Sequence, residues 1–158
     1  MQDLNKEYKR LLESKEFNKK GFLCSAFIMC DYKELKNSVW QFDFFDSKEN
    51  RITSYLMEKE IKNADKLEVF KEESAAIEEL NLSEVKISIT KSLEIANKTL
   101  EKTKETPTKT IIILQNISKP LWNVSFVTTS FNLVNTKINA VDGSILDHNS
   151  SSLLSFKK

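Results

Sequence analysis

The sequence predicts an α+β fold made of two helix-plus-antiparallel-sheet repeats, each helix packed on a curled three- to four-stranded sheet. Three observations lead to this prediction. Residues 121–146 alternate apolar and polar side chains, as two antiparallel strands with a turn at each end do. An amphipathic helical pattern precedes them. The same order, a helix and then strands, already occurs once in the first half of the chain.

The stretch 121–146 divides into two faces. The side expected to be buried carries Trp122, Val124, Phe126, Val134, Thr136, Ile138 and Ala140. The residues between them are polar and suit the water-facing side of an antiparallel sheet: Asn123, Ser125, Asn135, Lys137 and Asn139. Asp142-Gly143 predicts a turn, because glycine adopts positive φ without steric cost, and residues 144–146 begin a last short strand.

The first half predicts a helix, a central strand and a hairpin. An amphipathic helix is expected at 3–17, with Gly21 as its C-terminal stop. Residues 22–30 are apolar on both faces, which is typical of a strand that is covered on both sides or lies centrally in a sheet. A charged connection (31–38), a strand (39–46), a polar turn (47–50) and a returning strand (51–57) complete this half.

The middle of the chain predicts one strong helix among weaker elements. A charged surface connection (58–66), a short strand (67–70) and a short helix (72–80) come first. The apolar stripe from Leu82 to Leu100 then predicts a helix over 83–104 with Ser83 as its N-cap. Pro107 ends that stretch, and the β-branched run 108–115 predicts the next strand.

An offset of 82 residues aligns the inward positions of the two halves and predicts an internal duplication. It places Trp40 on Trp122, Phe42 on Val124, Phe44 on Phe126, Ile52 on Val134 and Leu56 on Ile138. The expected division is a degenerate repeat at 1–66, a connection at 67–81 and a second repeat at 82–158. The expected structural anchors are Trp40, Phe42, Phe44, Trp122, Val124, Phe126 and Gly143. The two tryptophans are interpreted as core anchors in preference to ligand-stacking groups.

The second half resembles the PepSY family. The residues that carry this resemblance are the helix opening 82–85, the strand start Trp122-Asn123-Val124 and the closing pattern 139–146, Asn-Ala-Val-Asp-Gly-Ser-Ile-Leu. Asn139 stands where the family has an acidic residue, and Asp142 stands where it has threonine. The first half keeps a Trp-led strand but has no glycine turn after Met57, so it resembles a degenerate copy. The resemblance implies a cystatin-like, non-enzymatic module that restrains or binds peptidases and other extracytoplasmic proteins.

Composition limits the possible functions. The 158 residues include 24 Lys and Arg against 23 Asp and Glu, so the general electrostatic reason to expect nucleic acid as a partner is missing. No window has the roughly 20 apolar residues that a membrane-spanning helix needs. The charged N-terminus lacks the apolar core of a signal peptide, which predicts a cytoplasmic chain as written and an extracytoplasmic one if a leader has been removed.

No catalytic, cofactor or metal cluster is expected. His148 is the only histidine and lies in a polar stretch near the C-terminus, where it is expected to be solvated. Cys24 and Cys30 lie six positions apart in one strand, which favours free thiols over a disulfide. There is no glycine-rich phosphate loop.

These observations leave three hypotheses open. The first is a non-catalytic module that binds a protein or peptide at a sheet edge or a sheet face. The second is a cystatin-like or chaperone-like scaffold acting as a homodimer, which the two-faced apolar strand 22–30 favours. The third is an enzyme of unrecognised type, which a pocket that gathers two or more acidic residues with His148 would support.

Overall fold

Antiparallel strand pairing organises the whole chain, for which we analysed a computed structural model that describes residues 1–63, 67–68 and 77–156. The helical elements are α1 (Leu4–Leu12), η1 (Tyr32–Asn37), η2 (Leu82–Glu84), α3 (Ile89–Thr103) and η3 (Leu153–Phe156). The strands are β1 (Phe22–Asp31), β2 (Gln41–Asp46), β3 (Arg51–Leu56), β4 (Lys62–Asn63), β5 (Leu67–Glu68), β6 (Pro107–Ile117), β7 (Lys119–Thr128), β8 (Asn132–Asn139) and β9 (Ile145–Ser152).

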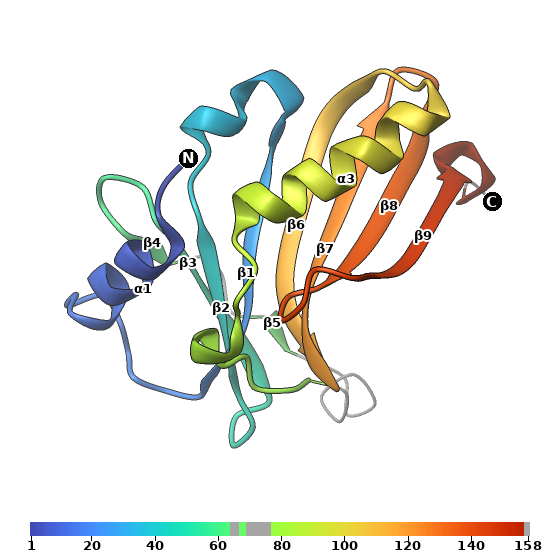
Figure 1. Cartoon of the computed structure of the whole chain (residues 1–158). Coiled ribbons are helices and arrows are strands. Elements are labelled where there is room, and N and C mark those ends of the chain that lie inside the picture. Colours follow the sequence, from blue (N-terminus) through green and yellow to red (C-terminus); the bar gives the residue numbers. More distant parts are fainter. Residues whose placement is uncertain (64–66, 69–76, 157–158) are drawn as a thin grey trace.

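All of these strands belong to one sheet. Its order is β4-β3-β2-β1-β6-β7-β8-β9, with β5 also paired to β3 (Figure 1). Every pair of neighbours is antiparallel. The first half of the chain joins the second through β1 and β6, in a register that runs from Ser25 opposite Gln115 to Asp31 opposite Lys109. The predicted α+β class is therefore confirmed, and the two halves share one continuous sheet.

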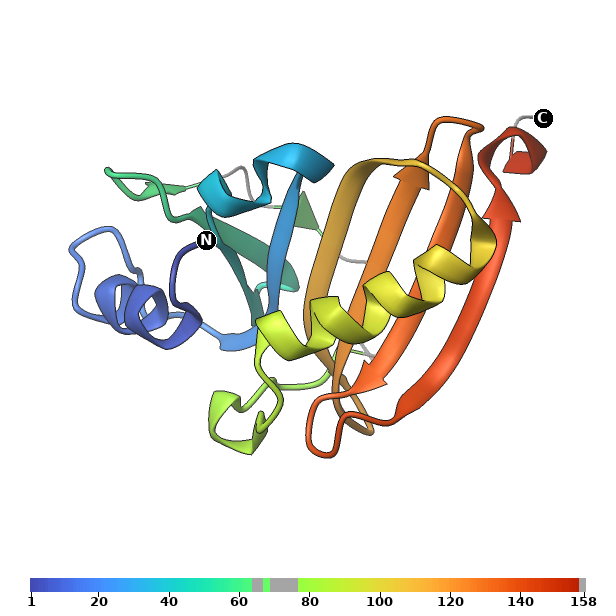
Figure 2. The same cartoon turned by 45° about the horizontal axis from the view of Figure 1, so that its top comes forward.

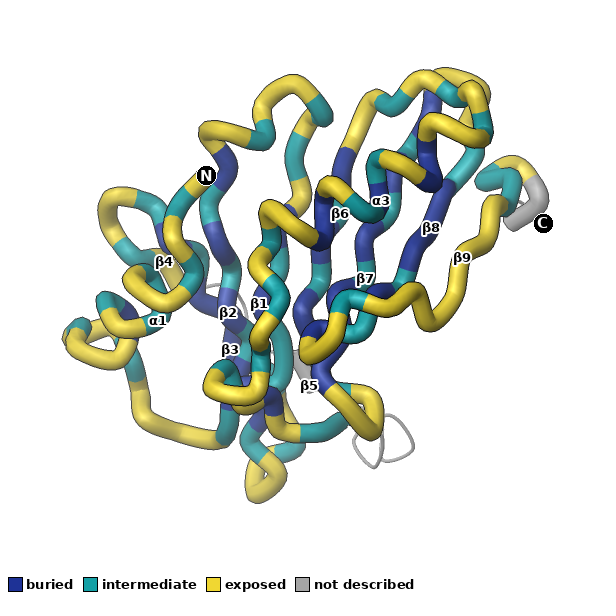
Figure 3. The backbone as a smooth tube through the Cα atoms, viewed as in Figure 1, coloured by how far each residue is buried: buried dark blue, intermediate teal, exposed yellow. Residues whose placement is uncertain are grey.

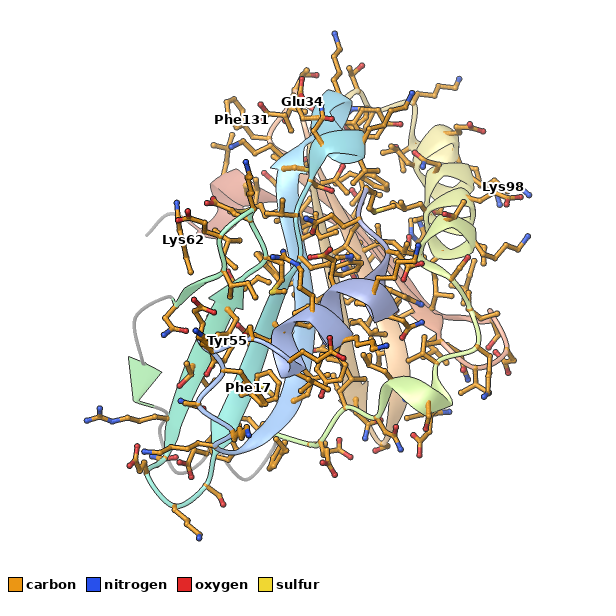
Figure 4. The ribbon with its side chains drawn as sticks, turned by 90° about the vertical axis from the view of Figure 1, so that its left-hand side faces the viewer. Phe17, Glu34, Tyr55, Lys62, Lys98 and Phe131 are labelled. Carbon is orange, nitrogen blue, oxygen red and sulfur yellow. The ribbon has the colours of Figure 1, made fainter. Side chains whose placement is uncertain are left out.

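Both long helices lie on the same face of this sheet (Figure 2). On α1, the ring centroid of Tyr8 lies 5.4 Å from that of Phe42 on β2. On α3, the hydroxyl of Thr99 lies 2.7 Å from that of Thr136 on β8. Because Phe42 and Thr136 point to the same side of the sheet, we call this side the helical face and the other side the open face. Figure 4 shows Phe17, in the loop after α1, beside Tyr55 of β3, and Lys98 of α3 pointing away from the sheet.

The helix predicted at 83–104 begins later than expected. Residues 82–84 form the short helix η2, and α3 begins at Ile89 with Ser88 as its N-cap, whose hydroxyl accepts a hydrogen bond from the amide of Lys91 at 3.1 Å. The amides of Lys86 and Ile87 both donate to the carbonyl of Ala140, at 2.8 and 2.9 Å. These bonds to the turn after β8 hold the backbone out of a helix, so the prediction of Ser83 as the N-cap was wrong.

Two other predictions of local structure were also wrong. The first helix ends at Leu12 instead of continuing to residue 17, so Gly21 does not terminate it. Residues 77–80 form no helix, and residues 72–76 lie outside the described part of the chain. Of the strand predicted at 67–70, residues 67–68 are β5 and the others lie outside the described ranges.

The predicted turn at Asp142-Gly143 is present and leads into β9, which is longer than predicted. Gly143 has φ of +81°, and a Cβ atom placed there would lie 3.4 Å from the side chain of Ile87. Gly21 also has positive φ, +76°, but a Cβ atom there would lie 2.2 Å from the carbonyl oxygen of Phe45. Gly21 therefore opens β1 at a point where another backbone comes too close for any side chain.

We predict that Gly21→Ala destabilises the protein more than Gly143→Ala. Alanine at Gly143 should cost about 1–2 kcal/mol, the price of left-handed backbone for a residue with a Cβ atom. Alanine at Gly21 adds a clash with backbone that cannot move as a side-chain tip does. Urea unfolding of both variants measures the difference, and a Gly21→Ala protein as stable as the Gly143→Ala protein would contradict it.

A second prediction concerns Glu105, in the connection between α3 and β6. Its carboxylate accepts hydrogen bonds from the hydroxyl of Ser130 and, at 2.7 Å, from the side-chain amide of Asn132. These bonds lower the pKa of Glu105, the Ser130 bond most. A lowered pKa in the folded state stabilises the fold above the unfolded pKa of about 4.3, and this contribution is lost as pH falls through the folded pKa.

Glu105→Gln should therefore lower the stability at pH 7 and weaken its dependence on pH in the acid range. Thermal melts between neutral and acid pH test this, with Glu101→Gln on the exposed side of α3 as the control. Parallel stability curves for Glu105→Gln and the unsubstituted protein would rule out the proposed contribution.

Candidate functional site

The two faces of the sheet differ in what covers them. On the helical face, α1 and α3 cover residues such as Phe42, Val124 and Phe126, which are 0–1% exposed. On the open face, no helix as long as α1 or α3 covers the strands in the part of the chain that the structure describes (Figures 1 and 2). The alternating residues of β1, β6, β7 and β8 that point there are mostly half-buried. Among the described residues, the open face is therefore a candidate surface for a partner.

Seven apolar residues lie near one another in register on the open face, with Gln41 of β2 between Leu56 and Phe27. Strand register places Met29 opposite Ile111, Phe27 opposite Ile113 and Val127 opposite Leu133. Leu56, opposite Gln41, extends the strip onto β3. We call this set the open-face strip: Phe27, Met29, Leu56, Ile111, Ile113, Val127 and Leu133. Met29 is 60% exposed and the other six are half-buried. Isolated exposed apolar residues are normal, whereas a contiguous patch marks an interaction surface.

Hydrogen-bonded polar groups border the strip on the first half. The carboxylate of Asp43 on β2 accepts bonds from the Ser25 hydroxyl at 2.9 Å and the Gln41 amide at 3.0 Å, and also from the Ser54 hydroxyl. These side chains satisfy one another across three neighbouring strands. They therefore form a border that needs no further partner when the apolar strip is covered.

A second polar group borders the strip on the other half. The side-chain amide of Asn135 on β8 donates to the carbonyl oxygen of the Asn123 side chain and, at 2.8 Å, to the Ser125 hydroxyl. Asn135 is only 8% exposed, so the prediction that it faces water was wrong. Its amide is buried by the neighbouring strands and satisfied by their side chains.

The two cysteines of β1, Cys24 and Cys30, are poor nucleophiles. Burial, and then the carboxylate of Asp43, raises the pKa of the Cys24 thiol to about 12. Burial and the nearby Asp31 raise the pKa of Cys30 as well. Both are free. Since the thiolate is the reactive form, neither cysteine is prepared for covalent catalysis at neutral pH.

The aromatic anchors predicted from the sequence lie together under the helices. Trp40, Phe42, Phe44, Trp122, Val124 and Phe126 are all at most 3% exposed. The indole rings of Trp40 and Trp122 touch, with centroids 6.3 Å apart. Each indole N–H donates to a backbone carbonyl just before a helix: Trp40 to Gln2 at 3.0 Å and Trp122 to Ile87 at 2.9 Å. Both tryptophans are thus enclosed core residues, out of reach of a ligand.

His148 lies on the exposed strand β9, on the helical face. Its Nδ1 lies 3.2 Å from the Thr136 hydroxyl and 3.1 Å from the carbonyl oxygen of Asn135. Within residues 1–63, 67–68 and 77–156, no three histidine, cysteine or acidic side chains come close enough to hold a metal ion.

Two hollows on the described surface gather no catalytic set either. One of about 430 Å³ lies between the starts of α1 and α3 and includes Asp3 and Ser88 in its lining. Both of these side chains already cap their own helices. Another, of about 190 Å³, is lined by Cys24, Gln115 and Asn116. In neither hollow do a nucleophile, a base and an orienting group converge.

Comparison with known proteins supports the fold and no more. The chain matches no known family model and no curated protein sequence. It is similar to the crystal structure of a putative lipoprotein from Clostridium difficile 630, with a TM-score of 0.54 and 14% identity over 87% of each chain. In the described residues, no helix is both long enough and apolar enough to cross a membrane.

The sequence gives a partial indication of this surface. Residues 22–30 and 111–114 are apolar at consecutive positions, so each strand offers apolar side chains to both faces. Such a run predicts a central strand, which β1 and β6 are. It cannot tell whether the second face is covered by the chain's own helix or left for another molecule.

Proposed function

We propose that this protein is a non-catalytic module that binds a protein or peptide through the open-face strip. The observation that carries the proposal is the contrast between the two faces of one sheet. Helices bury one face, while the other presents an apolar strip that includes Met29 at 60% exposure. Burying apolar surface contributes roughly 25 cal/mol per Å², so covering this strip would favour binding.

The shape of the strip favours an amphipathic helix as the bound segment. The strip runs obliquely from Leu133 on β8 to Leu56 on β3, and α3 also crosses the strands obliquely on the helical face (Figure 1). Five spacings between neighbouring strands amount to roughly 24 Å, which about 16 residues of α-helix span. The bordering amides and hydroxyls are already hydrogen-bonded, so a helix that covers the strip leaves none of them without a partner.

We predict that Met29→Lys removes binding without unfolding the protein. The substitution places a charge at the middle of the strip, yet a residue so exposed should change stability by no more than about 0.5 kcal/mol. Leu12→Lys is the matched control, because Leu12 is also exposed, at 41%, but ends α1 on the helical side.

Affinity purification from the native cell extract, with quantitative mass spectrometry, measures the effect. Partners held by the strip should be recovered with the unsubstituted protein and with Leu12→Lys, and recovered at least about tenfold less with Met29→Lys, a loss of 1.4 kcal/mol or more. Equal recovery by all three proteins would exclude the strip as the binding site.

We also propose that residues 1–66 and 82–158 are structural repeats joined by 67–81, with the second repeat PepSY-like and the first a degenerate copy. The hydrogen bonds of the two indole N–H groups support this proposal. Trp40 donates to the carbonyl of Gln2 and Trp122 to that of Ile87, and each of these carbonyls stands two residues before a helix. At the 82-residue offset Met29 corresponds to Ile111, and the β1–β6 register places these two residues opposite each other. The polar pairs Asp43–Ser54 and Ser125–Asn135 also occupy matching positions in the two hairpins.

PepSY-like character adds a class of partner to the proposal. The bound protein would then be a peptidase or an envelope protein that this module restrains. A fold shared at 14% identity does not distinguish between these two classes of partner. The identity of the protein that is recovered in the affinity experiment distinguishes them.

If the halves are repeats, the two tryptophans should contribute alike. Trp40→Phe and Trp122→Phe each remove one indole N–H and leave a carbonyl just before a helix without its donor, at a cost of roughly 1–3 kcal/mol. Urea unfolding should give losses of similar size. A large loss for one variant and none for the other would contradict the equivalence of the two positions.

A further inference from the structure

We infer that β9 is a self-association edge, at which two copies of this chain pair their β9 strands antiparallel and join their sheets into one. This contact is independent of the open-face strip and of the partner proposed for it. It would make the protein a dimer whose two open faces lie on the same side of a continuous sheet.

The two ends of the sheet are protected to different degrees. At one end, the outer side of β3 is covered by β4, through Asn63 and Lys62, and by β5, through Leu67 and Glu68. At the other end, residues 145–151 of β9 pair only with β8 in the described part of the chain. Figure 3 shows β9 as exposed along most of its length, in contrast to its neighbour β8. A ladder of backbone donors and acceptors is thus presented to solvent.

The sequence of β9 has few of the features that prevent edge pairing. Natural edge strands are protected by charged side chains, proline, bulges, short length or a cover. This strand, ILDHNSSS, has a register shift at Leu146 and one acidic residue, Asp147, but it is eight residues long and has no proline, lysine or arginine. Ile145 and Leu146 at its start are 49% and 41% exposed, so pairing would also bury apolar surface.

Symmetry favours a second copy as the occupant. Paired residues in an antiparallel ladder point to the same face, so a two-fold axis must pass through a residue that lies opposite itself. If most of β9 pairs with β9 of the other copy, the residue opposite itself must lie near the middle of the strand. This residue is then His148 or Asn149. In these two registers Asp147 lies opposite Asn149 or Ser151 of the other copy, and never opposite another Asp147. No like charges therefore oppose each other.

The chain already contains an antiparallel strand pairing of this kind, between its two halves. Strands β1 and β6 pair antiparallel, with Met29 opposite Ile111, its equivalent at the 82-residue offset, and with helices of both halves on one face. An antiparallel β9–β9 pairing would repeat this geometry between two molecules. On the helical face, α3 packs against β7 and β8, so the copy can approach β9 without meeting that helix.

The first experiment is sedimentation equilibrium of the full chain from low micromolar to near-millimolar concentration. The expected mass rises from one chain to two, and amide hydrogen exchange in residues 145–151 slows at high concentration. Asn149→Lys combined with Ser150→Lys places lysines on the edge and should leave a monomer with an unchanged melting temperature, because both residues are exposed.

A cross-linking experiment tests the register. In a Cys24→Ala, Cys30→Ala background, either His148→Cys or Asn149→Cys should form a disulfide-linked dimer, since Cα atoms about 4.5–5.5 Å apart are within disulfide reach. Ser83→Cys, exposed on η2 and not part of β9, is the control and should stay monomeric under the same oxidation.

Two results would overturn the inference. One is a single-chain mass at every concentration. The other is a dimer that persists in the double lysine variant but is lost with Met29→Lys, which would place the contact between copies on the open face. Either result leaves the partner experiment on Met29 to be judged separately, since that experiment measures binding of another protein.

Discussion

The antiparallel pairing of β1 with β6 is the contact on which the other features of this molecule depend. It joins the first and second halves into one sheet and brings Trp40 and Trp122 into contact under the helices. It also creates the open-face strip, because Phe27 and Met29 lie opposite Ile113 and Ile111 in this same pairing. The same strand pairing thus places the enclosed core on one face of the sheet and the exposed strip on the other.

Features that depend on local sequence were predictable. Alternation of side chains identified β2, β7 and β8 to within a few residues, because each has one face more deeply buried than the other. Strand β3 was also located, but Ile52 and Leu56, predicted to point inward, lie on the open face, because Thr53 and Tyr55 pair with Phe44 and Phe42. The turn at Asp142-Gly143 was predictable because few residues tolerate φ near +81°. The coarse α+β class follows from these elements, whereas the equivalence of the two halves remains a proposal.

What the sequence could not supply depends on contacts between distant residues. The late start of α3 follows from two bonds to the carbonyl of Ala140, which lies more than fifty positions away from Lys86 and Ile87. The burial of Asn135 depends on Asn123 and Ser125 across the hairpin. An apolar run such as 22–30 also looks the same whether its second face meets a helix or solvent, so the candidate site emerged only from the structure.

The spacing of the central pair has a consequence for biosynthesis. Asp31 lies 78 positions before its partner Lys109, and Ser25 lies 90 positions before Gln115. A nascent chain can pair β1, β2 and β3 early, yet β1 must then wait until about half as many residues as the whole chain contains have been added before β6 can pair with it. During that interval the second edge of β1, with Phe27 and Ile28, is unpaired, and unpaired strand edges favour association with other chains.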